Sequence, residues 1–415
     1  MSTGALTGLK ILDFTTLYPG PLATMLLADL GAEVTRIDAP DRPDLLRFLP
    51  PHGPADAQGE PVGAVYSLVG RNKRSIVLDL KSPAAKSVVT RLVRSHDIVI
   101  EQFRPGVMDR LGLGYDELRV AQPGLIFCSI SAFGQTGPLA QRPGHDINFL
   151  ALAGLSHHIG RAGGGPVPLG TLVGDVGGGT WGAVSGVLAA VIHRMKTGEG
   201  QRIDISMTDG ALLMNAMAAT EALAAGTDTT AGGHWLNGGT AYDYYETADD
   251  RWLAVGALEQ KFYGMLLTAL QLEHLDDQWL AQGEDAVDQK RAIAAAIGAQ
   301  PLAHWRDVFA ALPCCVEAVL TPTEAVRSDL FAERAMVVPV PVKRRDRTSG
   351  GPSPSAVTDA TTLQVGNPIK LSACPPRYDH VGPLPGADTR AVLAEAGLSE
   401  AEITALIEAG VAGQS

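Results

Sequence analysis

The sequence predicts an α/β protein whose sheet is mostly parallel and covered by helices. Short apolar segments typical of buried strands alternate with segments of helical periodicity along the first half of the chain. In the first such unit, residues 9–14 are predicted to form a strand, 21–30 a helix that Gly31 ends, and 33–37 the next strand. A strand–helix–strand unit of this kind joins parallel strands, with the helix packed across them.

The same alternation continues to about residue 205, and the composition then changes. Further strands are predicted at 75–78, 98–101, 125–129 and 202–205, with a helix at 84–94 among them. After Asp209 come an Ala- and Met-rich helix, a Gly/Thr-rich stretch at 225–240 and the strands of a smaller α+β unit within 242–259. A terminal helical pair is predicted at 391–396 and 399–409. The segments 39–62 and 343–358 are predicted to be a surface loop and a linker.

Composition excludes several classes of partner. The 415 residues carry 33 basic and 45 acidic side chains, a formal net charge of −12, and 46% hydrophobic residues. This is a soluble globular composition, and the negative charge argues against nucleic acid or an anionic membrane as the main partner. An anionic ligand therefore has to be bound by local basic groups.

No membrane span, signal peptide or metal site is expected from the sequence. The apolar run at 182–192 is about half as long as a membrane span requires, so it is expected to be a core helix. The N-terminal residues lack a basic region followed by an apolar core. The four cysteines show no metal-ligand spacing, which favours a reducing, cytoplasmic setting: Cys128, Cys314, Cys315 and Cys374.

Three short segments contain the residues best suited to proton transfer at carbon. They are Gly144–Asn148 with His145, Val173–Gly177 with Asp175, and Val255–Glu259. Asp175 precedes the small-residue apolar helix that begins near Trp181, so it is expected at a helix N-terminus, where the dipole favours the ionised carboxylate. A carboxylate facing a histidine is a plausible base and acid couple. For Asp175 alone, a role as a helix N-cap is the simpler alternative.

Motifs distributed along nearly the whole chain resemble the family III CoA-transferase superfamily. They are GLKILD at 8–13, LADLGAEV at 27–34, RNKRSI at 71–76, FRPGV at 103–107, GQTGP at 134–138, GEGQ at 198–201 and GNPIK at 366–370. Within that superfamily, GHDIN at 144–148 and VGALEQKFY at 255–263 are similar to α-methylacyl-CoA racemases. The transferase branch keeps an aspartate at the position of Asp175 but does not usually carry the histidine motif.

This resemblance implies a fold, a partner and a substrate. It implies a Rossmann-like large CoA-binding domain (1–205), a connecting helix and small domain (206–335), and a linker with a C-terminal return to the large domain (336–415). Two chains would form an interlocked homodimer, with each active site between the large domain of one subunit and the small domain of the other. The implied substrate is a 2-methylacyl-CoA thioester, of which coenzyme A is a part, and no separate cofactor or metal is expected.

The resemblance also implies a role for each site residue. His145 and Asp175 would exchange protons with the α-carbon from opposite faces through an enolate. Glu259 would hydrogen-bond the imidazole, and the backbone N–H of Asp146 would hold the enolate oxygen. Arg36, Lys73 and Arg104 match positions that hold the adenine and phosphates of CoA, for which arginine's planar guanidinium is well suited. Met207, Met214 and Met217 either line the acyl pocket or pack in the core.

Other activities remain open on the sequence. A CoA-transferase would use Asp175 as a covalent nucleophile, and the long segment from Asn367 resembles the transferase pattern, although such an enzyme has no evident need for His145 with Glu259. A non-catalytic acyl-CoA-binding homologue is the second alternative. The turn at 17–21 lacks the glycine fingerprint of dinucleotide binders, which disfavours a nicotinamide dehydrogenase. Fatty-acid, sterol side-chain and xenobiotic thioesters would all present the same reacting centre.

Overall fold

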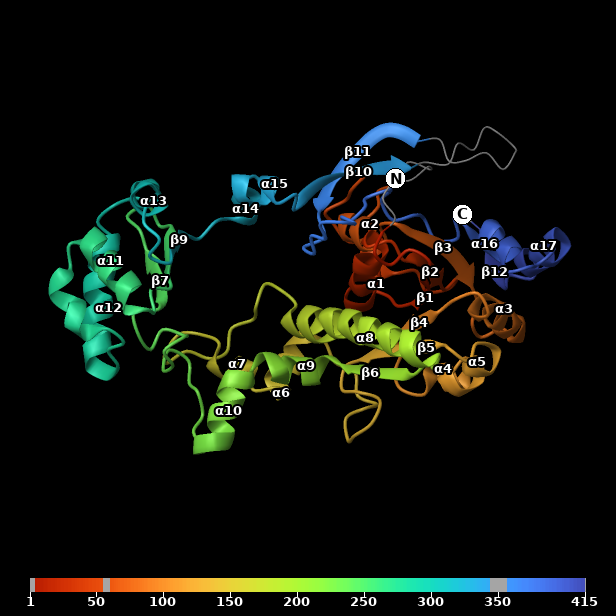
Figure 1. Cartoon of the computed structure of the whole chain (residues 1–415), viewed down its shortest axis with the longest axis horizontal. Coiled ribbons are helices and arrows are strands. Elements are labelled where there is room, and N and C mark those ends of the chain that lie inside the picture. Colours follow the sequence, from red (N-terminus) through yellow and green to blue (C-terminus); the bar gives the residue numbers. More distant parts are fainter. Residues whose placement is uncertain (1–3, 55–59, 344–356, 415) are drawn as a thin grey trace. The chain divides into compact units, whose positions relative to one another are not determined.

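The computed structural model describes residues 4–54, 60–343 and 357–414. The chain forms two compact units, and each of them is assembled from separate stretches of sequence. The first unit comprises Met1–Phe149, Thr171–Leu213 and Asp329–Ser415, and the second comprises Leu150–Gly170 and Met214–Ser328. Figure 1 follows the chain through both units. The chain therefore leaves the first unit twice and returns to it twice.

The first unit is organised around a sheet that, within the described residues, has seven strands in the order β12-β3-β2-β1-β4-β5-β6. Neighbouring strands run parallel except at β12, which is antiparallel to β3. The expected mostly parallel sheet is confirmed, and the order reverses between β1 and β4, as in doubly wound folds. The strands are β1 (Lys10–Phe14), β2 (Glu33–Asp38), β3 (Lys73–Leu78), β4 (Ile98–Glu101), β5 (Ile126–Ser131), β6 (Arg202–Ser206) and β12 (Ala412–Gly413).

Helices connect these strands as the apolar periodicity predicted. The predicted helices at 21–30, 84–94, 391–396 and 399–409 are α1 (Pro19–Asp29), α3 (Pro83–Val93), α16 (Thr389–Glu395) and α17 (Glu400–Glu408). Proline at the start of α1 and α3 suits the first helical turn, where a missing N–H costs nothing. Shorter helices of this unit are α2 (Ala64–Val69), α4 (Val107–Arg110), α5 (Tyr115–Ala121) and α15 (Asp329–Glu333). Two further helices, α6 (Asp146–Leu152) and α9 (Met207–Met214), begin in this unit and end in the second.

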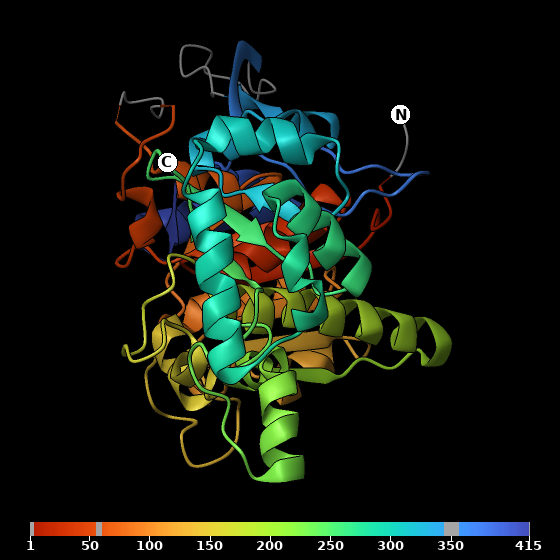
Figure 2. The same cartoon turned by 90° about the vertical axis from the view of Figure 1, so that its left-hand side faces the viewer.

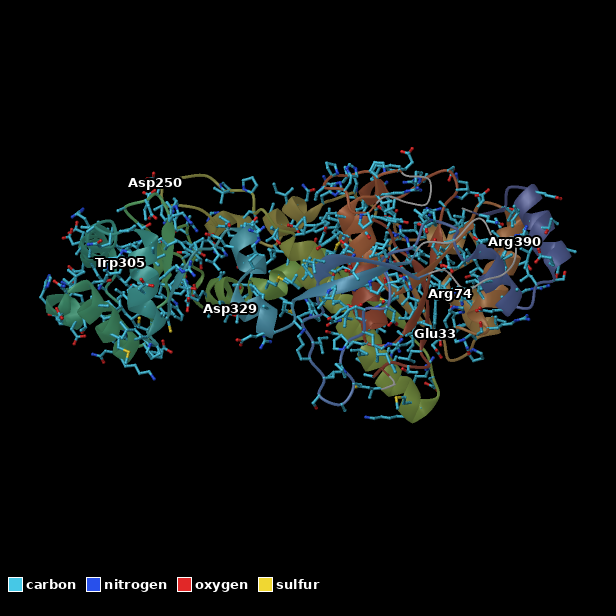
Figure 3. All side chains as sticks on the ribbon, turned by 90° about the horizontal axis from the view of Figure 1, so that it is seen from above. Glu33, Arg74, Asp250, Trp305, Asp329 and Arg390 are labelled. Carbon is cyan, nitrogen blue, oxygen red and sulfur yellow. The ribbon has the colours of Figure 1, made fainter. Side chains whose placement is uncertain are left out.

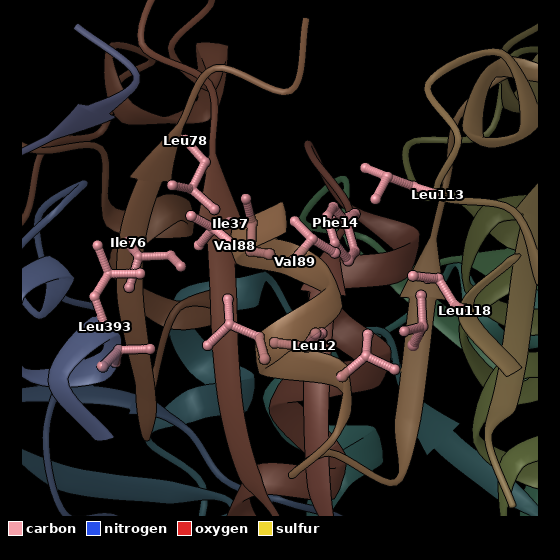
Figure 4. Close-up of a cluster of buried hydrophobic side chains, with 14 of the residues drawn as sticks. Leu12, Phe14, Ile37, Ile76, Leu78, Val88, Val89, Leu113, Leu118 and Leu393 are labelled. Carbon is pink, nitrogen blue, oxygen red and sulfur yellow. The ribbon is translucent and has the colours of Figure 1, made fainter. Parts of the chain in front are cut away.

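A continuous apolar cluster fixes one face of the sheet to its helices (Figure 4). Alternate residues of three strands enter it, because successive side chains of a strand point to opposite faces. Val88 and Val89 of α3 and Leu393 of α16 meet these strand residues, and each is at most 3% exposed. The strand residues are Leu12, Phe14, Ile37, Ile76 and Leu78. This packing fixes the strands relative to one another, and their carboxyl ends lie at one edge of the sheet.

A single helical segment of 24 residues, Gly174–Thr197, begins with a π-helix (Gly174–Thr180) and continues as α8 (Trp181–Thr197). It is long and apolar enough to span a membrane, which the shorter run at 182–192 did not indicate. It nevertheless packs on the sheet, where Gly182 and Gly186 let its backbone approach the side chains of Ile205 and Ile203. The expected core helix is therefore present.

The second unit contains the antiparallel strands β7 (Asp243–Glu246), β8 (Trp252–Val255) and β9 (Val316–Ala318). Tyr263, Leu266, Ile293 and Trp305 lie in its core, and Figure 3 shows Trp305 among the surrounding side chains. Figure 2 gives a view in which its helices face the reader. These helices are α7 (Leu155–His158), α10 (Ala216–Ala225), α11 (Gln260–Leu270), α12 (Gly283–Ile297), α13 (Leu302–Ala310) and α14 (Pro322–Val326). The Ala- and Met-rich helix predicted after Asp209 is thus divided between α9 and α10.

The two predicted irregular segments differ from expectation. The ends of the predicted linker 343–358 belong to an antiparallel strand pair, β10 (Val337–Lys343) and β11 (Val357–Val365), and its central residues lie outside the described part of the chain. The predicted loop at 39–62 contains a 3₁₀ turn (Leu45–Arg47) and an inward-facing Asp44 that is 5% exposed. The Asp44 carboxylate accepts hydrogen bonds from the backbone N–H groups of Leu17 and Leu46, so the start of this segment is fixed to the first strand–helix turn.

Candidate active site

The segment around His145 leads directly into α6 and is anchored by an aromatic pair. Phe149, which is fully buried, packs edge-to-face against Phe133 with 5.7 Å between the ring centroids. A Cβ on Gly144 would lie 2.7 Å from the Phe149 ring, so this close approach requires glycine. The Asn148 side chain accepts a hydrogen bond of 3.0 Å from the backbone N–H of His145. This segment therefore holds its backbone rigidly while the His145 imidazole remains exposed.

The next residue, Asp146, connects this segment to the one that contains Asp175. Asp146 is the first residue of α6 and is 7% exposed. Its Oδ1 accepts a hydrogen bond of 2.9 Å from the backbone N–H of Asp175. A Cβ on Gly174 would lie 3.2 Å from the same Oδ1, so glycine leaves room for the carboxylate. This contact joins the two predicted catalytic segments within the first unit.

Asp175 lies in the first turn of the π-helix and is half-buried. Burial, and after it the charge of Asp146, raise the pKa of its carboxyl to about 6, against the opposing effect of the charge of His145. The expectation that the helix N-terminus keeps Asp175 in its ionised form is therefore wrong in its direction, because desolvation and a like charge outweigh the helix dipole. A carboxyl with a pKa of about 6 can both accept and release a proton near neutral pH.

The π-helix is itself packed tightly at two consecutive glycines, Gly178 and Gly179. A Cβ on Gly178 would lie 2.5 Å from the Met207 carbonyl oxygen, and one on Gly179 would lie 3.1 Å from Pro19. The Thr180 hydroxyl donates a hydrogen bond of 2.8 Å to the Pro19 carbonyl oxygen. Met207 is 6% exposed and packs on this helix, which supports the core alternative for that residue. Single π-helical turns are often found at functional sites.

Glu259 belongs to the second unit. It precedes α11 as its N-cap residue, is exposed, and its carbonyl oxygen accepts the N–H groups of Phe262 and Tyr263. Its hydrogen bond to the imidazole of His145 remains a prediction. His158, for which the sequence indicated no role, bonds the Asn215 side chain at 2.8 Å within the second unit.

The three residues assigned to CoA lie in different environments. Arg36 is 2% exposed, pairs with Asp38 at 3.0 Å and Asp44 at 2.8 Å, and lies over the Tyr66 ring at 4.9 Å. Its Nη1 has no hydrogen-bond partner among the described residues. Arg104, in contrast, is exposed and follows the carboxyl end of β4, where the strand order reverses. Both positions are compatible with a ligand at this edge.

Lys73 differs from both arginines. It is the first residue of β3 rather than a residue at the strand's carboxyl end, and it is 1% exposed. Its Nζ donates to Asp13 at 3.0 Å, to the Pro21 carbonyl oxygen at 2.9 Å and to Thr24 at 2.6 Å. An ammonium group has three N–H donors, and all three are used inside the protein. This geometry supports a structural role for Lys73.

Two buried groups were not found from the sequence. Arg71 and Asp29 form an ion pair at 2.6 Å, which Asn367 and Asn72 extend by hydrogen bonds, so the RNK and GNP motifs meet in one structural network. Glu101, at the end of β4, is 4% exposed, and burial raises its pKa to about 7. A carboxylate at the end of an apolar strand is the only sequence signal that could have indicated Glu101.

Among the described residues there is no group of three or more His, Cys, Asp or Glu side chains placed to hold a metal ion. All four cysteines are described and are free thiols, with Cys128 and Cys314 buried.

Comparison with known proteins agrees with this architecture. The sequence profile described as CoA-transferase family III matches residues 6–389. The chain is 37% identical to an alpha-methylacyl-CoA racemase of Homo sapiens over 80% of this chain and 82% of that protein. It is 32% identical to an acetyl-CoA:oxalate CoA-transferase of Acetobacter aceti over 92% of each chain. A crystal structure of a CAIB/BAIF family protein from Brucella suis superimposes with a TM-score of 0.80 at 26% identity, covering 95% of this chain and 100% of that one. The chain therefore belongs to CoA-transferase family III, an enzyme family whose members similar to this chain include both racemases and CoA-transferases.

Proposed function

We propose that the protein is an α-methylacyl-CoA racemase, an isomerase that inverts the α-carbon of 2-methylacyl-CoA thioesters. The observation that carries this proposal is that the Asp146 carboxylate joins the segment of His145 to the backbone N–H of Asp175 in one unit, where the Asp175 carboxyl has a pKa of about 6. General acid–base catalysis is most efficient when the pKa of the catalytic group lies near the working pH. The similarity to the human racemase supports the same reaction.

The proposed reaction moves one proton off the α-carbon and another onto it. The thioester carbonyl acidifies the α-hydrogen, because the negative charge delocalises onto oxygen as an enolate. With neutral His145 and protonated Asp175, the imidazole takes the proton and Asp175 delivers its own to the opposite face. One C–H bond breaks, one forms, and the two residues exchange protonation states. The reverse direction uses protonated His145 and ionised Asp175.

Stabilisation of the enolate is assigned to the backbone N–H of Asp146. The first N–H groups of a helix have no acceptor within the helix, and Asp146 begins α6. An N–H fixed where negative charge develops is typically worth about 10²–10³-fold in rate. No metal or separate cofactor is required by this scheme, since coenzyme A is part of the substrate.

Arg104 and Arg36 are the residues we assign to the CoA nucleotide. Arg104 offers an exposed guanidinium, and Arg36 offers an unpartnered Nη1 at the same edge of the sheet. A guanidinium binds phosphate through two parallel hydrogen bonds and stacks on adenine. Because the whole chain carries a net charge of −12, these local groups have to attract an anionic ligand.

A homodimer with shared active sites completes the proposal. Helix α10 is apolar, yet none of its residues is buried in the single chain, and Met217 and Leu223 are 52% and 89% exposed. Exposed apolar helices of this kind usually mark an interface, and we assign it to a second copy. In that dimer, the exposed Glu259 of one copy would hydrogen-bond His145 of the other. The four free thiols fit a cytoplasmic location.

Hydrogen exchange at the α-carbon tests the reaction directly. A single epimer of a 2-methylacyl-CoA is incubated with the enzyme in deuterium oxide, without any free carboxylic acid. We expect the opposite epimer to appear with deuterium at the α-carbon. If neither inversion nor exchange occurs, and CoA instead passes to an added acid, the racemase proposal fails.

CoA transfer is the second candidate, and the similarity to the Acetobacter aceti CoA-transferase favours it. Asp175 would then attack the thioester carbonyl and form a mixed anhydride while CoA leaves as the thiolate. An exposed His145 beside Asp175 has no role in that step, and a free nucleophile benefits from a lower pKa than the one that Asp175 has. Trapping of the anhydride with hydroxylamine, in the presence of acyl-CoA alone, distinguishes the two reactions.

A further inference from the structure

We propose that the side chain of Asp146 is a positioning residue for proton transfer: it fixes the backbone of Asp175 and keeps a second negative charge beside the Asp175 carboxyl. This inference rests on the proposed racemase function and adds to it, because the role assigned above to Asp146 involves only its backbone N–H.

The geometry of the contact is the first argument. The Asp146 carboxylate is buried, and its Oδ1 accepts the Asp175 N–H at 2.9 Å across 29 residues of sequence. Charge-assisted hydrogen bonds are about twice as strong as neutral ones. This bond fixes the backbone of Asp175 itself, in addition to the packing of Gly174 against Phe149. A displacement of about 1 Å at a catalytic group can cost about 10²-fold in rate.

The surroundings of Asp175 are the second argument. Among the described residues, two charged groups act on the pKa of the Asp175 carboxyl: Asp146 raises it and His145 lowers it. The residues of α1, α6 and α9 that lie closest to the glycines of the π-helix are, apart from Asp146 itself, Pro19, Phe149, Met207 and Gly210, none of which titrates. Asp146 is thus the protein's main electrostatic means, besides burial, of holding a proton on Asp175 near neutral pH.

Three substitutions separate charge from position. Asp146→Asn keeps an oxygen that can accept the Asp175 N–H but removes the charge, Asp146→Glu keeps the charge but displaces the oxygen, and Asp146→Ala removes both. The matched control is Asp329→Asn, because Asp329 is an exposed acidic residue at the first position of the short helix α15 in the same unit (Figure 3). Thermal unfolding of each variant verifies that it folds.

The readout is the pH dependence of inversion, measured from each epimer. In the direction of inversion that uses Asp175 as the base, its carboxyl must start ionised, so the rate rises as pH passes its pKa. In the opposite direction the carboxyl must start protonated, so the rate falls as pH passes the same pKa. We call the rise and the fall the two limbs of the pH profile. Removing a like charge lowers the pKa of a carboxyl, so Asp146→Asn should move both limbs to lower pH by up to about one unit. Asp146→Glu should leave both limbs at the wild-type pH and lower kcat. Asp146→Ala should lower kcat by about 10–100-fold.

The inference is overturned if both limbs of the pH profile lie at the same pH in Asp146→Asn as in the control Asp329→Asn. If only the backbone N–H mattered, all three variants would retain wild-type rates, which overturns it equally. Titration of the Asp175 carboxyl by ¹³C NMR, in the wild type and Asp146→Asn, measures the same shift without turnover. This titration tests the inference even without turnover. Failure of the racemase proposal is seen separately, as a lack of deuterium exchange at the α-carbon with the wild-type enzyme.

Discussion

Asp13 and Asp175 are two carboxylates of the same unit with opposite properties. Asp13 is the fully buried penultimate residue of the first strand. Burial raises its pKa, but Lys73 and the hydroxyls of Thr15 and Thr24 more than compensate, so the pKa is lowered. Asp175 is half-buried, and its pKa is raised to about 6, first by burial and then by the charge of Asp146. The comparison teaches that burial alone does not set the pKa of a carboxyl: Lys73 and two hydroxyls overcome burial at Asp13, whereas burial and a neighbouring carboxylate act in the same direction at Asp175.

The largest expected effect follows from removing the carboxyl that exchanges protons. Asp175→Asn should reduce inversion and deuterium exchange by about 10³-fold or more, since general acid–base groups contribute about 10²–10⁴-fold each. Its thermal stability at pH 8 should be unchanged or higher than that of the wild type. Exchange measured by mass spectrometry and unfolding by calorimetry verify the two parts. Loss of folding in this variant would contradict the contrast drawn with Asp13.

The structural region should respond in the opposite way. Lys73→Ala leaves the Asp13 carboxylate buried without its cation, which typically costs about 3–5 kcal/mol of unfolding free energy. Lys81→Ala is the control, because Lys81 forms a surface ion pair with Asp41 at 2.7 Å with its side chain 71% exposed, and such pairs contribute about 1 kcal/mol or less. Urea unfolding compares the two variants. Equal losses would show that the Lys73 network is not structural.

Arg104 tests the assignment of the nucleotide site. Arg104→Ala should raise KM for the acyl-CoA about 10-fold, because a hydrogen bond to a charged group is worth about 1.5–3 kcal/mol, and should leave the melting temperature unchanged. Arg110→Ala, an exposed arginine on α4, is the control. A change in kcat without a change in KM would argue against a binding role.

The smallest effect concerns stability and pH. The Asp175 carboxyl has a pKa of about 6 in the folded chain and an ordinary value of 3.8. Its ionisation therefore lowers the free energy of unfolding as pH rises from 3.8 to about 6. Below pH 3.8 the wild type and Asp175→Asn should be equally stable. The variant should gain relative stability between pH 4 and about 6 and keep a constant advantage above pH 7. Parallel calorimetric curves across this range would contradict the raised pKa.

Sequence reasoning predicted the sheet and its helices well because buried parallel strands are continuous apolar runs. Strand β12 was missed, since two residues carry no periodic pattern. At the site, the motif placed His145 and Asp175 in one unit, but the Asp146 carboxylate contact could not be foreseen, because it joins backbone and side chain across two irregular segments. Lys73 was assigned to CoA because it matches a family position that holds the nucleotide, and only the fold revealed the three acceptors around it.

The π-helix at Gly174–Thr180 also constrains how this site can change during evolution. A residue deleted from or inserted into the glycine run would rotate Asp175 about the helix axis by about a quarter of a turn relative to α8. Substitutions alter contacts gradually, whereas a change in length would turn the carboxyl away from its substrate in a single step. The number of residues between Asp175 and Trp181 is therefore expected to be fixed among racemases that share this site, even where the glycines are replaced.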